Sequence, residues 1–258
     1  MLKLAQRCDE KSIFDFCRND LIGTRIACYT KAYGFDNDFF SVWINIIDAD
    51  VKCIVAKFYD SITVKAIDGC EINEINAFCE MLSFSDLMCD SKTAELLRPE
   101  ISEIKKSYVF RGNADGYSLP DIGEEYYKQL YALVSENISG SFENSKEAYL
   151  AWLSDFTFRK HRKLARCKGV AVDSILHSSV VTSCETENSA LLSAVVTSNI
   201  SRGKGLGKIT VLSMTNELKS ENKEVYVIAL NSSAEGFYEH IGFEFLEYIY
   251  FCKNRCKQ

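Results

Sequence analysis

Residues 191–208 read LLSAVVTSNISRGKGLGK, and the pattern of apolar residues and glycines in this segment is its most informative feature. Its apolar part predicts a strand over residues 190–197, and a helix is predicted over residues 208–219. Between the two, three glycines stand at alternating positions. Glycine lacks a Cβ, so such a turn can aim consecutive backbone N–H groups at one point, and the helix N-terminus adds unpaired N–H groups. The stretch therefore predicts a strand–turn–helix unit that binds an anionic group.

The composition of this turn favours a pyrophosphate as the anion. Its formal positive charge comes from Arg202, Lys204 and Lys208, and its glycines are Gly203, Gly205 and Gly207. A Walker loop needs a different spacing of glycine and lysine. The dinucleotide fingerprint Gly-x-Gly-x-x-Gly needs its third glycine one residue later than Gly207. A plain helix-capping turn is the alternative interpretation of these residues taken alone.

The segments that flank the turn predict an α/β region. Before it, the spacing of apolar residues predicts helices over 122–136 and 145–167 and strands over 169–173 and 178–183. After it, the pattern predicts a buried strand over 224–230, a short helix over 233–240 and an aromatic strand over 243–252.

A second motif lies at the end of this region, and together the two motifs resemble those of the GNAT N-acetyltransferase superfamily. Arg202–Gly207 matches the family's Arg/Gln-x-x-Gly-x-Gly/Ala motif at each defined position. Downstream, the second motif consists of Asn231, Ala234, Phe237, Tyr238 and Ile241–Phe243. The resemblance covers the second half of the chain. It implies a mixed α/β fold, a central mixed sheet flanked by helices, and transfer of an acetyl group from acetyl-CoA to a primary amine by direct attack.

A turn-rich segment, RGNADGYSLPDIG at 111–123, predicts a boundary between two domains, residues 1–118 and 119–258. The phrase Phe78–Phe84 resembles Phe237–Phe243, and each phrase is predicted to close a short helix that follows a strand. We therefore interpret the chain as tandem GNAT-like modules.

The first module is interpreted as a degenerate, non-catalytic copy. It lacks the glycine turn, and Cys79 stands where Tyr238 stands in the matching phrase.

The resemblance implies a role for each residue of the two motifs. The strand end Val195–Thr197 is expected to pair with pantetheine amides and to offer an N–H to the carbonyl oxygen. The residues assigned to acyl-CoA are Val195, Val196, Thr197, Arg202, Gly203, Lys204, Gly205, Leu206, Gly207, Lys208 and Asn231. Tyr238 is the candidate general acid, because a phenol with a pKa of about 10 can protonate a departing thiolate. The alternative is that Tyr238 packs in the core.

The general base is less evident in the sequence. Many members of the superfamily carry a glutamate in the middle of the strand before the turn, but Leu191 stands at that place here. Glu187, and less favourably Glu185, lie further back on the same predicted strand face and are candidates to act through a water. The alternative is that both belong to a solvated hairpin tip.

Cysteine usage and charge exclude several other classes of protein. Eleven cysteines without a CxxC pair argue against a thiolate zinc site, so we expect no metal and reduced thiols that serve as small hydrophobes. With no apolar leader and no long apolar run, the sequence predicts a cytoplasmic protein without a membrane association. The net charge of −6 argues against a nucleic-acid partner. The basic run over 159–168 is interpreted as an exposed helix face, and His161, His177 and His240 are given no catalytic role.

Three functions remain open at this point. The first is an N-acetyltransferase with a small-molecule or peptide amine as acceptor. The second is a non-catalytic acyl-CoA-binding or regulatory protein, which the missing mid-strand glutamate favours and Tyr238 opposes. The third is a protein that binds nucleotide phosphates. The sequence fixes neither the acceptor amine nor the acyl-chain preference nor the oligomeric state.

Overall fold

The computed structural model describes residues 1–138 and 143–253, and the chain divides into two compact units. Unit 1 consists of Met1–Tyr108, Ile228–Gly236 and Phe245–Gln258, and unit 2 consists of Val109–Val227 and Phe237–Glu244. The domain boundary predicted after residue 118 remains a prediction. No helix among the described residues is both long and apolar enough to cross a bilayer.

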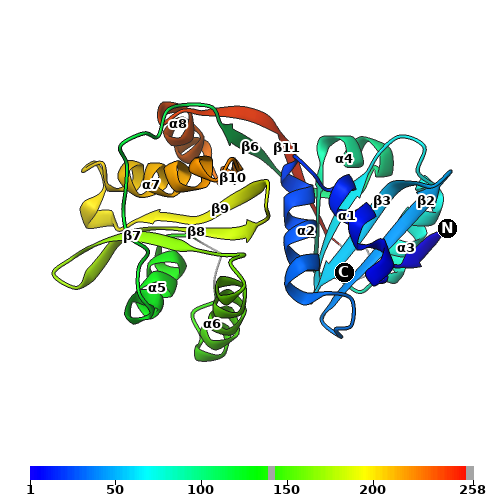
Figure 1. Ribbon diagram of the computed structural model, residues 1–258, viewed down its shortest axis with the longest axis horizontal. Coiled ribbons are helices and arrows are strands. Elements are labelled where there is room, and N and C mark those ends of the chain that lie inside the picture. The colour runs from blue at the N-terminus through cyan, green and yellow to red at the C-terminus, as the bar shows by residue number, and fades with distance from the viewer. Residues whose placement is uncertain (139–142, 254–258) are drawn as a thin grey trace. The chain divides into compact units, whose positions relative to one another are not determined.

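Unit 1 is a mixed sheet with helices (Figure 1). Its elements are β1 (Leu2–Leu4), α1 (Glu10–Phe16), α2 (Leu21–Tyr33), β2 (Phe40–Ile47), β3 (Asp50–Phe58), β4 (Ser61–Ala66), α3 (Ile72–Met81), β5 (Asp86–Asp90), α4 (Ser91–Leu97), β6 (Ile101–Phe110), which ends in unit 2, and most of β11 (Phe243–Lys253). The strand order is β1-β2-β3-β4-β5-β11-β6. β4 and β5 run parallel, with α3 as the crossover between them, and β11 is antiparallel to β5.

Unit 2 repeats the same order of elements. They are α5 (Tyr127–Asn137), α6 (Lys146–His161), β7 (Cys167–Val172), β8 (Ile175–Glu185), β9 (Ser189–Thr197), α7 (Leu206–Ser220), β10 (Glu224–Ile228) and the end of α8 (Ser232–His240). The strands follow the order β10-β9-β8-β7, and β9 and β10 run parallel with α7 between them. Helices α5 and α7 cover opposite faces of these strands (Figure 1). The predicted mixed α/β fold with a central sheet is therefore confirmed.

Helix boundaries depart most from the sequence prediction in two places. The helix predicted over 145–167 ends at His161, because Lys163 adopts a left-handed φ of 60° and the chain turns into β7 at Cys167. The helix predicted over 122–136 begins only at Tyr127, after a 3-10 turn over Glu124–Tyr126.

The order of elements also corrects the proposed match between the two phrases. α3 follows β4 and leads into β5, as α7 follows β9 and leads into β10. The counterpart of α3 is therefore α7, and the counterpart of α8 is α4. The likeness of Phe78–Phe84 to Phe237–Phe243 pairs the ends of α3 and α8, so this alignment was wrong even though the modules are repeated. Cys79 is not the counterpart of Tyr238.

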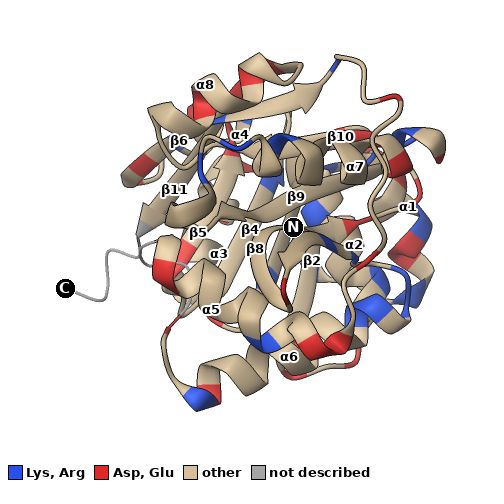
Figure 2. Cartoon of the chain, turned by 90° about the vertical axis from the view of Figure 1, so that its left-hand side faces the viewer, with Lys and Arg blue, Asp and Glu red and all other residues tan. Residues whose placement is uncertain are grey.

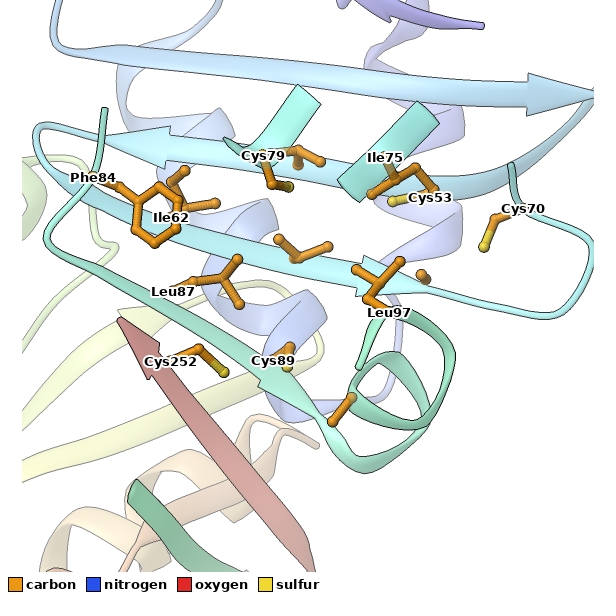
Figure 3. Packing of buried hydrophobic residues seen from close by; sticks show 14 residues of the cluster. Cys53, Ile62, Cys70, Ile75, Cys79, Phe84, Leu87, Cys89, Leu97 and Cys252 are labelled. Atoms are coloured by element: carbon orange, nitrogen blue, oxygen red, sulfur yellow. The ribbon is translucent and has the colours of Figure 1, made fainter. Parts of the chain in front are cut away.

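The cysteines are packed as small hydrophobic side chains. All ten in the described residues are free and nine of these are buried, whereas Cys256 lies outside the described residues. One cluster in unit 1 contains five of them (Figure 3): Cys53, Cys70, Cys79, Cys89 and Cys252. Burial raises the pKa of Cys79 to about 12, so this thiol stays protonated and unreactive at neutral pH. The nine buried cysteines therefore serve the core, as the sequence predicts, whereas Cys8 is exposed.

One carboxylate of unit 1 makes the stability of the protein depend on pH. Burial, with a contribution from Asp90, raises the pKa of Glu247 from 4.5 to about 7. Between these two values the folded state binds more protons than the unfolded state, so stability falls as the pH rises through this window. We expect Glu247→Gln to unfold at higher denaturant concentration than the wild type at pH 8, with the difference vanishing below about pH 4.5. Denaturation midpoints of the two proteins, measured across this pH range, check the prediction. The control is Glu244→Gln, which replaces an exposed carboxylate and is expected to show no such trend with pH.

Candidate functional site

The end of β9 extends beyond its parallel partner. The pairing of β10 with β9 covers Ser189–Leu192, whereas β8 accompanies β9 as far as Thr197. A bulge lies between these points: three steps along β9, from Ser193 to Val196, oppose two steps along β8, and Ala194 has a φ of 48°. In the part of the chain that the structure describes, one edge of Val195–Thr197 therefore has no strand beside it in this unit, and this is where the sequence predicts that pantetheine pairs.

The glycine turn has the backbone geometry that an anion site requires. Gly203 and Gly205 adopt φ values of 76° and 79°, in the left-handed region, and both face open space. Gly205 is the N-cap of α7, and no side chain caps this helix. The first N–H groups of α7 therefore have no side-chain partner at the helix N-terminus, where the helix dipole favours negative charge.

Side chains around the turn add charge and fix its position. Arg202 donates from Nε to the Thr197 carbonyl at 3.3 Å and from Nη2 to the Asn137 Oδ1 at 3.4 Å. Lys204 is exposed and Lys208 is partly exposed on the first turn of α7. A Cβ at Gly207 would lie 3.0 Å from the Thr197 Oγ1, so glycine lets the helix approach β9 closely. These residues fit a pyrophosphate group.

His177 is a residue of this site that sequence reasoning missed. Its Nδ1 lies 3.0 Å from the Ser201 Oγ and 3.3 Å from the Ser198 Oγ, in the segment that leads into the turn. No residue pattern indicates this contact, because it depends on the β8–β9 register, which pairs Ser178 with Thr197.

Tyr238 lies in the core of unit 2, 5% exposed, with ring centroids 5.4 Å from Phe237 and 5.6 Å from Phe243. Burial raises the pKa of Tyr238 above its usual value of 10, so the phenol carries its proton at neutral pH. The neighbouring Phe237 ring lies 3.7 Å from where a Cβ of Gly207 would stand. The structure thus brings Phe237 of the second motif close to Gly207 of the first, and both residues belong to unit 2.

Two other residues that the sequence predicts for the site, Asn231 and Glu187, have surroundings different from those of the glycine turn. Asn231, at the start of α8 in unit 1, accepts a hydrogen bond from the Ala234 N–H at 3.0 Å and so caps this helix. Glu187 is exposed in the turn between β8 and β9. A nine-residue strand separates it from the glycine turn, which corresponds to roughly 25 Å. The structure does not bring Glu187 to the turn.

Glu185 belongs to a buried ionic network at the same far end of β9. It is 1% exposed, accepts a hydrogen bond from the Lys223 Nζ at 2.6 Å and pairs with the Arg166 guanidinium. Arg166 also pairs with Glu217 and Glu221. The interpretation of Glu185 as part of a solvated hairpin tip was therefore wrong, because its carboxylate is enclosed by cations.

The basic run over 159–168 is only partly an exposed helix face. Arg162 and Lys163 are exposed, but Arg159 is buried and pairs with Asp155, and Lys168 is buried and pairs with Asp121 and Glu217. The interpretation as an exposed face was wrong for the buried members, because their side chains pack within unit 2 and pair with partly exposed carboxylates. Figure 2 shows that acidic and basic positions are spread over many elements of the chain.

The corresponding place in unit 1, between β4 and α3, has no such cradle. The Ala66 N–H at the end of β4 donates to the Thr93 Oγ1 at 2.8 Å, so a side chain of α4 occupies that peptide group. The turn that follows is acidic, with Asp68 and Glu71, and charges of this sign repel phosphate. That the first module is non-catalytic remains a prediction.

Comparisons with known proteins agree with this organisation. The family model described as FR47-like protein matches residues 171–252, a range that contains both motifs. No curated protein matches this sequence.

Solved structures with a similar fold cover nearly the whole chain. A tandem GNAT protein from the clavulanic acid biosynthesis pathway, solved without acetyl-CoA, is 12% identical with a TM-score of 0.65, and the match covers 100% of this chain and 99% of that one. A GNAT-family acetyltransferase from Colwellia psychrerythraea is 11% identical with a TM-score of 0.61 over 97% and 98% of the two chains. A GCN5-related N-acetyltransferase from Sphaerobacter thermophilus is 10% identical with a TM-score of 0.60 over 97% and 94%. At these identities the likeness shows the fold. The chain has the tandem GNAT fold, and the resemblance seen in the sequence is confirmed.

Proposed function

We propose that unit 2 is the catalytic module of an acyl-CoA-dependent N-acyltransferase that transfers an acetyl group from acetyl-CoA to a primary amine. One observation supports this proposal above all. The N-terminus of α7 has no side-chain cap and follows the turn with Gly203 and Gly205, and basic side chains flank it at the end of β9 that β10 does not cover. A pyrophosphate fits this cradle, and the pantetheine amides fit the edge of Val195–Thr197. The acceptor is a small-molecule or peptide amine.

The chain's own residues supply positioning and one proton. Acetyl-CoA, when bound, supplies the thioester that the amine attacks. The turn holds the phosphates, and the bulged end of β9 orients the carbonyl through a backbone N–H. The Tyr238 hydroxyl, which burial makes a weaker acid and leaves protonated at neutral pH, donates its proton to the departing thiolate. The proton that the amine loses on attack passes to water, and the tyrosinate is reprotonated from water. We do not assign the base to Glu187, because it lies at the other end of β9.

We expect Tyr238→Phe to lower kcat by about 100-fold, with little change in the KM for acetyl-CoA, because the variant keeps the aromatic packing and loses only the proton donor. Release of free CoA thiol in the presence of a panel of amines measures both constants. The matched control is Tyr131→Phe, which removes another hydroxyl of unit 2, one that donates to the Glu143 carbonyl at 2.7 Å. Equal losses in both variants would contradict the role of Tyr238.

A non-catalytic acyl-CoA-binding protein is the second candidate, favoured by the absence of a described glutamate from the middle of β9. This candidate predicts tight binding of CoA in calorimetric titration and no release of CoA thiol with any amine. It also predicts that Tyr238→Phe changes neither result. A nucleotide-phosphate binder is the third, and it predicts that ATP protects against thermal unfolding at least as well as acetyl-CoA.

We propose a cytoplasmic location, because the buried free thiols fit a reducing compartment.

A further inference from the structure

The imidazole of His177 connects the middle of the sheet to the segment that precedes the glycine turn. Its Nδ1 lies within hydrogen-bond distance of the Ser201 Oγ, at 3.0 Å, and of the Ser198 Oγ, at 3.3 Å. The His177 carbonyl also accepts the Ser198 N–H at 2.8 Å. One residue of β8 thus contacts both ends of the short 3-10 turn over Asn199–Ser201.

These contacts add to the backbone hydrogen bond from the Ser201 N–H to the Ser198 carbonyl and to the hydrogen bonds of Arg202, which hold the same segment. Asn199 and Ile200 are exposed, and the glycines that follow populate many backbone conformations. Ser201, in contrast, is 4% exposed, and it directly precedes Arg202. The hydrogen bond between Ser201 and the imidazole therefore fixes the point at which the turn begins.

We propose that His177 is a positioning residue that holds the turn in its phosphate-binding conformation before the ligand arrives. This inference rests on the proposed function of unit 2, because the ligand is the pyrophosphate of an acyl-CoA. N–H groups that are already ordered bind an anion without the entropic cost of ordering the loop at that moment. His177 touches neither substrate nor reacting atoms, so its effect is on acyl-CoA binding and not on the chemical step.

The atom that makes these contacts allows a test by near-isosteric substitution. Nδ1 is bonded to Cγ, and asparagine carries a polar atom at the same position along the side chain. Glutamine carries its polar atoms one bond further out, where Nε2 stands in histidine. His177→Asn therefore keeps the contact to the serines, whereas His177→Gln and His177→Ala lose it.

Calorimetric titration with CoA measures the first consequence. We expect His177→Ala and His177→Gln to raise the dissociation constant of CoA by about tenfold, and His177→Asn to raise it by no more than about threefold. His161→Ala, which removes an exposed imidazole bonded to the Thr157 carbonyl, is the control and leaves the constant unchanged. Binding by His177→Ala at the wild-type constant, or binding by His177→Asn as weak as by the alanine variant, overturns the proposal.

Hydrogen exchange of the ligand-free protein gives a readout that does not depend on CoA. We expect His177→Ala to exchange faster over residues 198–208 while the rest of unit 2 and the denaturation midpoint stay as in the wild type. Faster exchange throughout unit 2 means a general structural role and overturns the proposal, as does unchanged exchange in the turn. If the wild type does not bind CoA at all, the proposed function fails, and the exchange experiment still decides whether His177 orders the turn.

Discussion

A variant that combines Gly203→Val with Gly205→Val is expected to bind CoA at least about 100-fold more weakly than the wild type. Both glycines have φ values near 80°, 76° and 79° respectively, where a β-branched residue is strained. The left-handed conformation costs roughly 1–2 kcal/mol for each non-glycine residue, and about 1.4 kcal/mol corresponds to a factor of ten in affinity. The surrounding space is open, so the backbone relaxes to negative φ without a clash, and this rotation turns the peptide N–H groups away from the phosphates.

The control for this double variant is another glycine of unit 2. Gly116 also has a left-handed φ, of 81°, and faces open space, but it lies outside the turn. Gly116→Val therefore carries the same local strain and leaves the dissociation constant of CoA unchanged. Calorimetric titration gives the constants, and denaturation midpoints show that each variant is folded. A double variant that binds CoA within a factor of about three of the wild type would contradict the cradle.

The glycine turn was predictable because its properties are local. Backbone freedom belongs to each glycine, and the charge of Arg202 and the start of α7 are neighbours in the sequence. The contact of His177 with Ser201 depends instead on how two strands align, since one step of register would carry the imidazole to the other face of the sheet. No pattern within one sequence gives that register.

The repeated modules show the same difference between local properties, which the sequence predicts, and properties of the whole fold, which it does not. Two related α/β halves were correctly expected from the sequence, and the structure shows that each contains a parallel strand pair with a helix between the strands. The detailed match failed because a short helix that ends in aromatic residues arises at any place where a helix packs on a sheet. The order of α3 and α4 against α7 and α8 is a property of the whole fold, and it assigns the counterparts that the phrase did not.

Removal of the Glu185 side chain is expected to lower the free energy of unfolding by about 3 kcal/mol, the range in which the loss of one partner from a buried ion pair falls. The carboxylate is 1% exposed and lies between two cations whose side chains are themselves only 15% and 10% exposed, Arg166 and Lys223. Glu185→Ala leaves these charges with less compensation in a region that is largely shielded from water. Glu221, whose pKa the hydrogen bond from Arg166 lowers to about 2, retains its pairing and limits the damage.

Glu187→Ala is the matched control, because Glu187 stands two residues further on and is exposed. Its substitution is expected to change the free energy of unfolding by less than about 0.5 kcal/mol. Denaturant titration measures the free energy of unfolding of both variants, and kcat of the folded fraction is measured in parallel.

If either glutamate were the general base, its alanine variant would lose about 100-fold in kcat. We expect neither variant to do so, because Glu185 ends β8 and Glu187 lies in the turn before β9, both remote from the glycine turn that follows β9. A stable Glu185→Ala variant with a large loss of kcat would instead restore the catalytic assignment.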